Sequence, residues 1–465
     1  MNGERHPDLV RGLGPWAATA IVVGTMIGTG IFIVPADMAR TAGTIKLVFV
    51  AWVAGGLLSL FGAFAYAELG AAIPEAGGEY AYIGRGFGPV WGFLFGWMHS
   101  IVGRAASIAA IAAGVLRFWG FLDPRVMMPL GSLHFSMPWS GKPYNFVFTL
   151  AMPLAVAAIA AVTFVNYFGV RLGGQVQVAL TAIKVAVMVA VIAVGLSFPF
   201  HAHLLASAAG GGHAKALGGF FAALVAALWA YDGWSNVNLV GSEIIHPGRN
   251  IPRALVIGVA SVMALYILTT AVCFYVLPFS KVAASPHVVS DVMARVSGPP
   301  AAVWITVAMI VCALGTLNSS ILSGARVDYA MARDRRFFRV AGGIHPQFRT
   351  PANALIFQCC LAAVLALTGT FEDLFSLFIF VQWIFYGLAA ASMMRLRRKE
   401  PDLPRPYRSW GYPVLPAIFI LGAVIVTSSV LIERPLRAGL AMVAILIGLV
   451  FYRHWRLEES AGSRG

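Results

Sequence analysis

Two short stretches of this sequence place glycines and polar residues inside otherwise apolar segments. The first, GTMIGTGIFIVP, runs from Gly24 to Pro35, and the second, LWAYDGWSNVNL, runs from Leu228 to Leu239. Glycine in a helix interior costs about 1 kcal/mol relative to alanine, so both stretches indicate interrupted helices. A break exposes amide and carbonyl groups that a polar ligand can pair with. Both stretches are therefore candidate binding segments.

The surroundings of these stretches are those of a membrane protein. The chain has 465 residues, of which 59% are hydrophobic and 11% charged, and its mean hydropathy is +0.80. Soluble domains are about 25% charged. A hydrocarbon core needs about 20 apolar residues and offers the backbone no hydrogen bonds, so we predict an all-α polytopic fold. The twelve expected spans are 14–40, 47–70, 89–117, 147–167, 175–199, 217–243, 254–278, 300–324, 353–369, 374–394, 412–432 and 437–455.

The basic residues predict the orientation of these spans. The net charge is +14, but no basic patch interleaved with aromatic residues points to nucleic acid. With the N-terminus inside, the cytoplasmic segments hold 21 Lys and Arg residues and the outer segments hold 9. This is the positive-inside bias. We expect a multi-pass protein of the cell inner (plasma) membrane with both termini cytoplasmic.

The cysteines and the ionisable residues exclude several site classes. The four cysteines all lie inside expected spans, so we expect no disulfide framework. No spacing of His and Cys residues is typical of a metal site, and we expect no metal and no cofactor. A membrane enzyme would need a catalytic group of residues near one face, and none is apparent. A channel would need a continuous lined pore, whereas two helix breaks indicate an occluding site.

The two breaks lie five spans apart, and an odd offset inverts the second unit. Paired interrupted helices in two halves are the best sequence pointer to the binding site of an inverted-repeat transporter. We predict a single transporter domain, 1–465, with repeats at 14–199 and 217–394 and two further helices at 412–455. The alternative for the first break alone is close helix packing through its glycines.

A zwitterionic amino acid would use both ends of such breaks. A half-helix N-terminus suits a carboxylate, which we expect at the amides of Thr29 and Gly30 and at the Thr29 hydroxyl. Bare carbonyls near the other half-helix ends suit the ammonium group. The predicted substrate-binding residues are Thr25, Met26, Gly28, Thr29, Gly30, Trp229, Ala230, Asp232, Gly233 and Ser235.

Lys184 is the deepest cation of the sequence, alone in an apolar span of about 25 residues. A charge at mid-bilayer costs at least about 2.5–3.5 kcal/mol, which favours a functional role over snorkelling. A proton carrier is one such role. Arg104 is the second deep cation and a candidate pathway residue. Asp232 lies at the second break, beside the expected site.

Further polar residues complete the set of candidates. We interpret Trp229 as a gate, because it lies mid-span rather than in the headgroup belt. Glu243 is expected to act as a gate or lock by pairing with Arg249, Arg253 or a neighbouring loop. Asn318 and Gln382 are candidates for the cavity wall, together with Asn236 and Ser319.

Five motifs spread over nearly the whole chain resemble the amino acid–polyamine–organocation (APC) superfamily, and most closely its L-type amino acid transporter group. They are GTMIGTGIFIVPADMA, AYAELGAAIPEAGGEYAYI, LWAYDGWSNVNLVGSEIIHPGRNIPRA, LGTLNSSILSGARVDYAMARD and RRKEPDLPRPYRSWGYPVLP. The resemblance implies a five-plus-five inverted repeat with two extra helices, and alternating access without a covalent reaction. It also implies a substrate-closing role for Trp229 and backbone contacts at Met26, Thr29 and Gly30.

The resemblance bears on coupling and partners as well. Sodium-independent members carry a lysine at the position of Lys184, where its ammonium group replaces sodium. Animal members carry a cysteine in the outer loop that bonds a glycoprotein partner, but residues 119–146 contain none, so we expect no disulfide-linked heavy chain. Asp232 stands where many relatives carry glycine.

The sequence therefore predicts a secondary transporter that moves amino acids by alternating access. We expect sodium independence and neutral L-amino acids, by exchange or by proton symport. The alternative within the superfamily is a polyamine or cationic amino acid carrier in which Asp232 pairs with the cation. A channel is the distant alternative, and saturable flux distinguishes a carrier from it.

Overall fold

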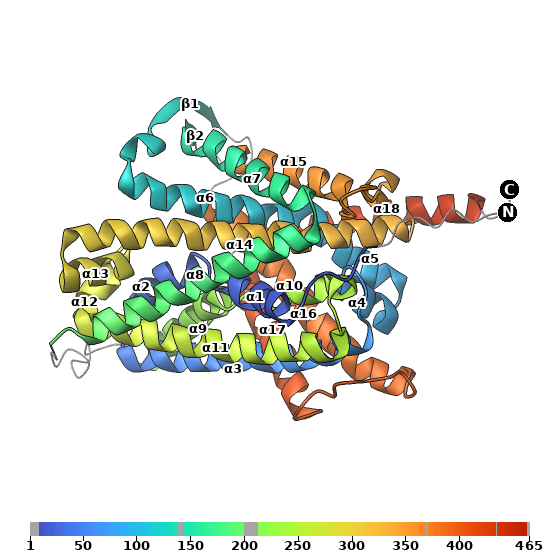
Figure 1. Cartoon of the computed structure of the whole chain (residues 1–465), viewed down its shortest axis with the longest axis horizontal. Helices are drawn as coiled ribbons and strands as arrows, with labels where there is room; N and C mark the ends of the chain where they lie inside the picture. The colour runs from blue at the N-terminus through green and yellow to red at the C-terminus, as the bar shows by residue number, and fades with distance from the viewer. Residues whose placement is uncertain (1–8, 137–142, 200–212, 369–370, 434, 463–465) are drawn as a thin grey trace.

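The computed structural model describes residues 9–136, 143–199, 213–368, 371–433 and 435–462. It is an elongated bundle of helices (Figure 1). The helices of the first half are α1 (Pro15–Met26), α2 (Gly30–Ala42), α3 (Ile45–Ala72), α4 (Glu79–Phe87), α5 (Pro89–Met98), α6 (Arg104–Leu122), α7 (Ala151–Tyr167) and α8 (Val170–Leu196). Those of the second half are α9 (His213–Ala230), α10 (Asn236–Leu239), α11 (Pro247–Val276), α12 (Phe279–Ala284), α13 (Val288–Ser297), α14 (Pro299–Arg333), α15 (Ala352–Thr368), α16 (Phe371–Lys399), α17 (Val414–Glu433) and α18 (Pro435–Gly462).

Many of these helices suit a membrane. Among the described residues, six helical segments are long and apolar enough to cross one: Pro15–Ala42, Ile45–Ala72, Pro89–Leu122, Val170–Leu196, Pro247–Val276 and Pro299–Arg333. Five shorter apolar helices accompany them. The chain is thus a helical, polytopic membrane protein. The division into twelve spans and two repeats stays a prediction.

Both predicted interruptions are present. The first lies between α1 and α2, where Ile27–Thr29 leave the helix, and the second lies between α9 and α10, over residues 231–235. Gly233 has a φ of 102°, a conformation that other L-residues rarely adopt, and a Cβ there would lie 2.5 Å from Thr25 Cγ2. The second break therefore requires glycine at this position.

The two broken helices are antiparallel neighbours. Helix α1 packs against α10, and α2 packs against α9, so the first half of each broken helix lies beside the second half of the other. Figure 1 shows α1 and α10 in the middle of the bundle and α2 and α9 nearer one end. This arrangement brings the two breaks together at the centre.

The sequence did not predict several of these elements, among them a π-helical segment and a β-hairpin. A π-helical segment, His99–Gly103, joins α5 to α6 and leads directly into Arg104. An antiparallel hairpin of β1 (Pro129–Ser136) and β2 (Pro143–Thr149) follows α6. π-helical turns inside helices occur frequently at functional sites. Of these two elements, the π-helical segment is the one that adjoins the centre of the bundle.

The loop between α3 and α4 is attached to the second broken helix. Ala76 pairs with Val240 in an antiparallel bridge, and the Gly77 amide donates to Leu239 O at 3.0 Å. Gly78 has a φ of 45°, and a Cβ there would lie 2.9–3.0 Å from the backbone of α10. The loop can approach α10 this closely only because Gly78 has no side chain.

We expect Gly78→Ala to lower the stability of the protein by at least about 1 kcal/mol, because the added methyl group meets backbone that cannot move aside and the φ is strained. Thermal unfolding of the purified protein measures this change. Gly14→Ala is the control, since a Cβ at Gly14 meets nothing within 4 Å. Equal melting temperatures for the two variants would contradict the close approach of this loop to α10.

Candidate functional site

A central cavity lies where the two breaks meet. Its volume is about 70 Å³, and α1, α2, α6, α9, α10 and α14 all contribute to its wall, together with the two breaks. The lining residues are Thr25, Met26, Gly28, Thr29, Gly30, Arg104, Ser107, Ala110, Ile111, Trp229, Ala230, Asp232, Gly233, Asn236, Thr316 and Ser320. Nine of the ten residues predicted to bind substrate are among them, as is the pathway candidate Arg104.

The two breaks touch each other at this cavity. A Cβ on Gly30 would lie 3.2 Å from the Cα of Ala230 and 3.7 Å from the Trp229 ring. Thr29 is the N-cap residue of α2, so the first amides of that helix begin at the cavity wall. Those amides have no partners within the helix and carry its positive dipole end. The cavity thus offers a favourable place for an anionic group.

Tyr266 of α11 joins the ends of α1 and α9. Its hydroxyl lies 2.5 Å from Met26 O and 3.2 Å from Ala230 O, and the residue is fully buried. A hydroxyl has one proton, so it donates to one of these carbonyls at a time. The expected ammonium contacts near Met26 and Ala230 therefore share their carbonyls with this tyrosine, which sequence reasoning missed.

Lys184 holds the first break in place from outside the cavity. Its Nζ atom donates to Gly24 O at 2.5 Å, Ile27 O at 2.7 Å and Thr316 Oγ1 at 2.8 Å, and its side chain has no exposed surface. One ammonium group thereby connects α8 with the end of α1 and with α14. All three of its protons are used, which fits a charged amine.

Two opposite charges line the cavity. Arg104 donates through Nη2 to Asn236 Oδ1 at 2.8 Å and through Nε to His99 Nε2 at 3.2 Å. Asp232 accepts a hydrogen bond of 2.9 Å from the Tyr386 hydroxyl. The π-helical segment precedes Arg104 directly, so it sets the position of the guanidinium group.

Three predicted residues lie outside the cavity wall. Ser235 is buried against the Tyr386 hydroxyl, 3.1 Å away. Asn318 instead joins α14 to α7 and α8, through Asn166 and Gln177 at 2.9 Å each, so it does not line this cavity. Gln382 is buried in α16 but does not line the cavity.

The partner of Glu243 is neither Arg249 nor Arg253 but a residue just beyond the expected span 300–324. The Glu243 carboxylate forms a bidentate pair with Arg326 of α14, with Nε–Oε1 and Nη2–Oε2 distances of 2.7 and 3.1 Å, and both side chains are at most 1% exposed. The carbonyl of Glu243 accepts from the amides of Gly12 and Leu13 at 3.0 Å. Proximity in the sequence favoured Arg249 and Arg253, whereas a long-range contact supplies the partner.

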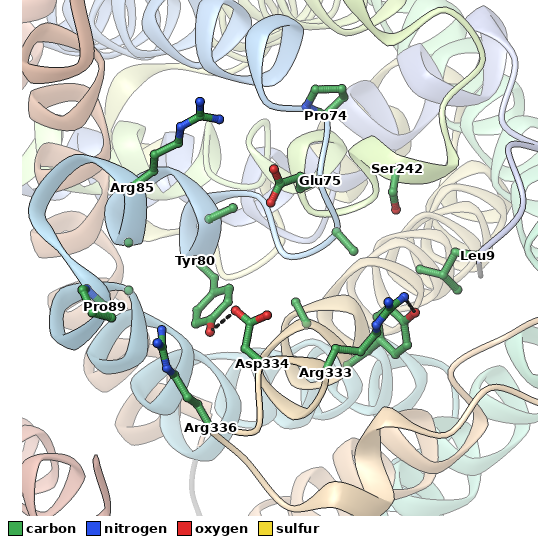
Figure 2. A pocket seen from close by; sticks show the side chains of 16 residues that line it. Leu9, Pro74, Glu75, Tyr80, Arg85, Pro89, Ser242, Arg333, Asp334 and Arg336 are labelled. Atoms are coloured by element: carbon green, nitrogen blue, oxygen red, sulfur yellow. Dashed lines mark hydrogen bonds between the residues drawn. The ribbon is translucent and has the colours of Figure 1, made fainter. Parts of the chain in front are cut away.

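A second cavity, of about 560 Å³, opens between α4, η4 (Gly241–Glu243) and the end of α14. Figure 2 shows Tyr80 and Asp334 joined across it, with a hydrogen bond of 2.7 Å, and Arg333 and Arg336 nearby. Burial and the neighbouring Asp334 raise the pKa of the Tyr80 hydroxyl, so it remains a donor. Along α14, Arg326 lies between the two cavities, because Ser320 lines the central cavity and Ala330 lines the second cavity.

Comparisons with known proteins point to one family. A family model described as amino acid permease matches residues 13–451. The chain is 30% identical to the serine/threonine exchanger SteT of Bacillus subtilis over 96% of both chains. It is 32% identical to the b(0,+)-type amino acid transporter 1 of Mus musculus over 96% of this chain and 88% of the relative. The human cystine/glutamate transporter is 28% identical over 97% of this chain and 86% of its own.

We expect Lys184→Met to destabilise the protein by about 1–3 kcal/mol for each carbonyl left unpaired in the core. The measurement is the unfolding temperature of the purified protein. Lys281→Met, which removes an exposed lysine, is the control. If both variants unfold at the wild-type temperature, the ammonium group does not stabilise the first break.

Proposed function

This chain belongs to the amino acid permease family, and from that premise we propose that it exchanges small neutral L-amino acids across the membrane without sodium. The proposal rests above all on the central cavity, which both helix breaks line. The α-carboxylate binds at the first amides of α2, next to Thr29 and Gly30. The α-ammonium group binds at the carbonyl ends of α1 and α9, where Tyr266 already contacts two carbonyls.

The charges of the cavity support a neutral substrate. Arg104 and Asp232 line it together, so one positive and one negative side chain face the ligand. A zwitterion with an uncharged side chain leaves this balance unchanged. A polyamine or a cationic amino acid would bring a second cation close to the Arg104 guanidinium, which costs energy in a low dielectric. The second candidate function, a cationic carrier, depends on Asp232 outweighing that repulsion.

The size of the cavity supports a small substrate. Its volume of about 70 Å³ leaves little room beyond the two breaks. Trp229 forms part of the wall, and we assign it the role of a gate that closes over the ligand. One relative, the serine/threonine exchanger of Bacillus subtilis, is named for substrates of this size class.

The contacts of Lys184 support sodium independence. Its ammonium group lies among the carbonyls of Gly24 and Ile27, at the end of α1 and the start of the break, and the Thr316 hydroxyl. These are oxygen ligands of the kind that a sodium ion prefers. A bound cation at this place would compete with a fixed positive charge. The lysine therefore performs the structural role of the ion and removes the need for it.

Alternating access accounts for the closed end of the bundle. The Glu243–Arg326 pair and the bonds from Gly12 and Leu13 to Glu243 seal the end at which α1 begins. We assign this end to the cytoplasm, with both termini there and the protein in the plasma membrane. A rocking group of α1, α2, α3, α9, α10 and α11, from two five-span inverted repeats, opens it by breaking these contacts. No outer-loop cysteine is present for a disulfide-linked heavy chain.

Uptake into proteoliposomes tests this function. We expect saturable uptake of radiolabelled serine into sodium-free vesicles preloaded with unlabelled serine, and about tenfold less into empty vesicles, because an exchanger returns to its outer state only with substrate bound. Flux that rises linearly with concentration would indicate a channel. Substantial uptake into empty vesicles under an inward proton gradient would indicate symport instead of exchange.

Asp232→Asn distinguishes the two substrate classes in the same assay. Under the proposed function, this variant keeps part of its serine exchange, because the binding groups are backbone amides and carbonyls. Under the cationic alternative, uptake of arginine or putrescine by the wild type exceeds that of serine and disappears in Asp232→Asn. Wild-type preference for arginine or putrescine would contradict the neutral assignment.

A further inference from the structure

We propose that Glu79 holds an exchangeable proton, in a buried site that it forms with Asp232, Asp328 and Arg104, and that this proton must be bound for the bundle to close as it does here. The proposal rests on the proposed transport function and adds a second ligand, the proton, to it. Glu79 lies at the start of α4 and is not one of the ten residues assigned to the substrate, although it interacts with two of them, Ser235 and Asp232.

The loop before α4 places Glu79 against the second break. Gly77 and Gly78 hold the chain on the backbone of α10, and Glu79 follows them directly. The Glu79 side chain is 1% exposed and interacts with the hydroxyl of Ser235, the last residue of the break. A change of charge at Glu79 is therefore felt at the half-helix that must move during transport.

Charge balance requires a proton in this region. Three carboxyl groups, those of Glu79, Asp232 and Asp328, interact electrostatically with the single guanidinium group of Arg104. Glu79, Asp328 and Arg104 are all at most 4% exposed. Unpaired charge in a protein core is costly, and such a group takes up a proton instead. If all three carboxyls were ionised, their charges would exceed that of Arg104 by two.

Hydrogen bonding identifies Glu79 as the carboxyl that holds the proton. Asp232 accepts from Tyr386, and Asp328 accepts from Ser100. Glu79 also interacts with the Ser235 hydroxyl, but its Oε2 atom is buried without a hydrogen-bond partner in the described structure. The buried Asn238 Oδ1 and the hydroxyls of Tyr66 and Tyr82 are likewise unpaired. A protonated carboxyl is the form that needs fewest donors, and it has a proton to donate itself.

The acidity of Glu79 fits this role. Burial raises the pKa of its carboxyl to about 7, although Ser235 and Arg104 oppose the shift. The titratable and charged groups that interact with Glu79 are Tyr66 of α3, Tyr82 of α4, Arg104 of α6, Asp232 of the break and Tyr386 of α16. His99 of the π-helical segment and Asp328 of α14 interact in turn with Arg104. Arg326, which is paired with Glu243, approaches the same loop at Gly77.

The second cavity brings water close to this site. Ala76, Tyr80 and Ala81, which lie near Glu79 in the chain, line that cavity. Figure 2 shows Tyr80 on its wall. A proton can therefore reach Glu79 from the sealed end of the bundle after a small movement of the loop. Loss of this proton leaves an extra buried negative charge beside Asp232, which favours separation of the loop from α10.

The pH dependence of exchange tests the proposal. Serine exchange is measured in preloaded, sodium-free proteoliposomes at about pH 6 and about pH 8, equal on both sides. The exchange rate of the wild type should be about tenfold lower at pH 8 than at pH 6, because the protonated fraction of one group with a pKa near 7 falls by that factor. Glu79→Gln, which imitates the protonated form, should exchange at a rate nearly independent of pH. Glu75→Gln, which removes an exposed carboxyl of the same loop, should behave as the wild type.

The outcomes separate the two proposals. Absence of serine exchange in the wild type at both pH values would overturn the proposed function. Exchange with the same pH dependence in the wild type and Glu79→Gln would overturn only the proton site. The pH dependence would then come from another group that the variant keeps, such as Lys184 or Asp232. A wild-type exchange rate that does not change between these pH values would overturn the proton site as well.

Thermal stability gives a readout that does not need transport. Because the pKa of Glu79 is higher in the folded protein than in the unfolded chain, the folded state binds more protons, and stability falls as pH rises from about 4.5 to about 7. The unfolding temperature of the wild type should therefore fall more between about pH 5 and about pH 8 than that of Glu79→Gln. Equal falls in the two proteins would contradict the proton site.

Discussion

A helix that unwinds inside a bilayer must find partners for the amide and carbonyl groups that the break exposes. In this protein the partners come from neighbouring helices. The Lys184 ammonium group binds one carbonyl in the last turn of α1 and one in the first break, and Tyr266 bridges the carbonyl ends of α1 and α9. Lys184 and Tyr266 bind these carbonyls from outside the cavity, whereas the first amides of α2 begin at the cavity wall. The proposed binding site thus depends on side chains that do not line the cavity.

The sequence was sufficient for the features that arise locally. Glycines at Gly24, Gly28 and Gly30 and the polar run after Trp229 predicted both breaks, because such residues are costly in a buried helix. The depth of Lys184 in its span predicted a buried amine, since a snorkelling lysine lies closer to the helix end. Each of these features depends on the residues of one segment alone, so the sequence of that segment is enough to predict it.

Long-range contacts could not be predicted in the same way. Glu243 pairs with Arg326, 83 residues away, and not with the arginines that follow it in the chain. Asn318 faces α7 and α8, because the rotation of α14 is set by its packing. Tyr266 lies in an ordinary apolar helix, and no local signal distinguishes it. The π-helical segment before Arg104 has no clear sequence pattern either.

Charge connects the cavity with the sealed end of the bundle. Arg104 lines the cavity, while the acidic groups around it extend from Asp232 at the break to Glu79 beside α10. A ligand that changes the position of α10 therefore also changes the surroundings of these carboxyls. This coupling is reciprocal, because the binding of one ligand alters the affinity for the other by the same factor.

The most direct test of this account is a structure of the purified protein with serine bound, determined by electron cryo-microscopy in lipid nanodiscs without sodium. The account predicts density for the amino acid in the central cavity, with its carboxylate at the amides of Thr29 and Gly30 and its ammonium group near the carbonyl ends of α1 and α9. The Lys184 ammonium group should remain on Gly24 O and Ile27 O. Serine density in the second cavity beside Tyr80 and Asp334, with the central cavity empty of ligand, would contradict it.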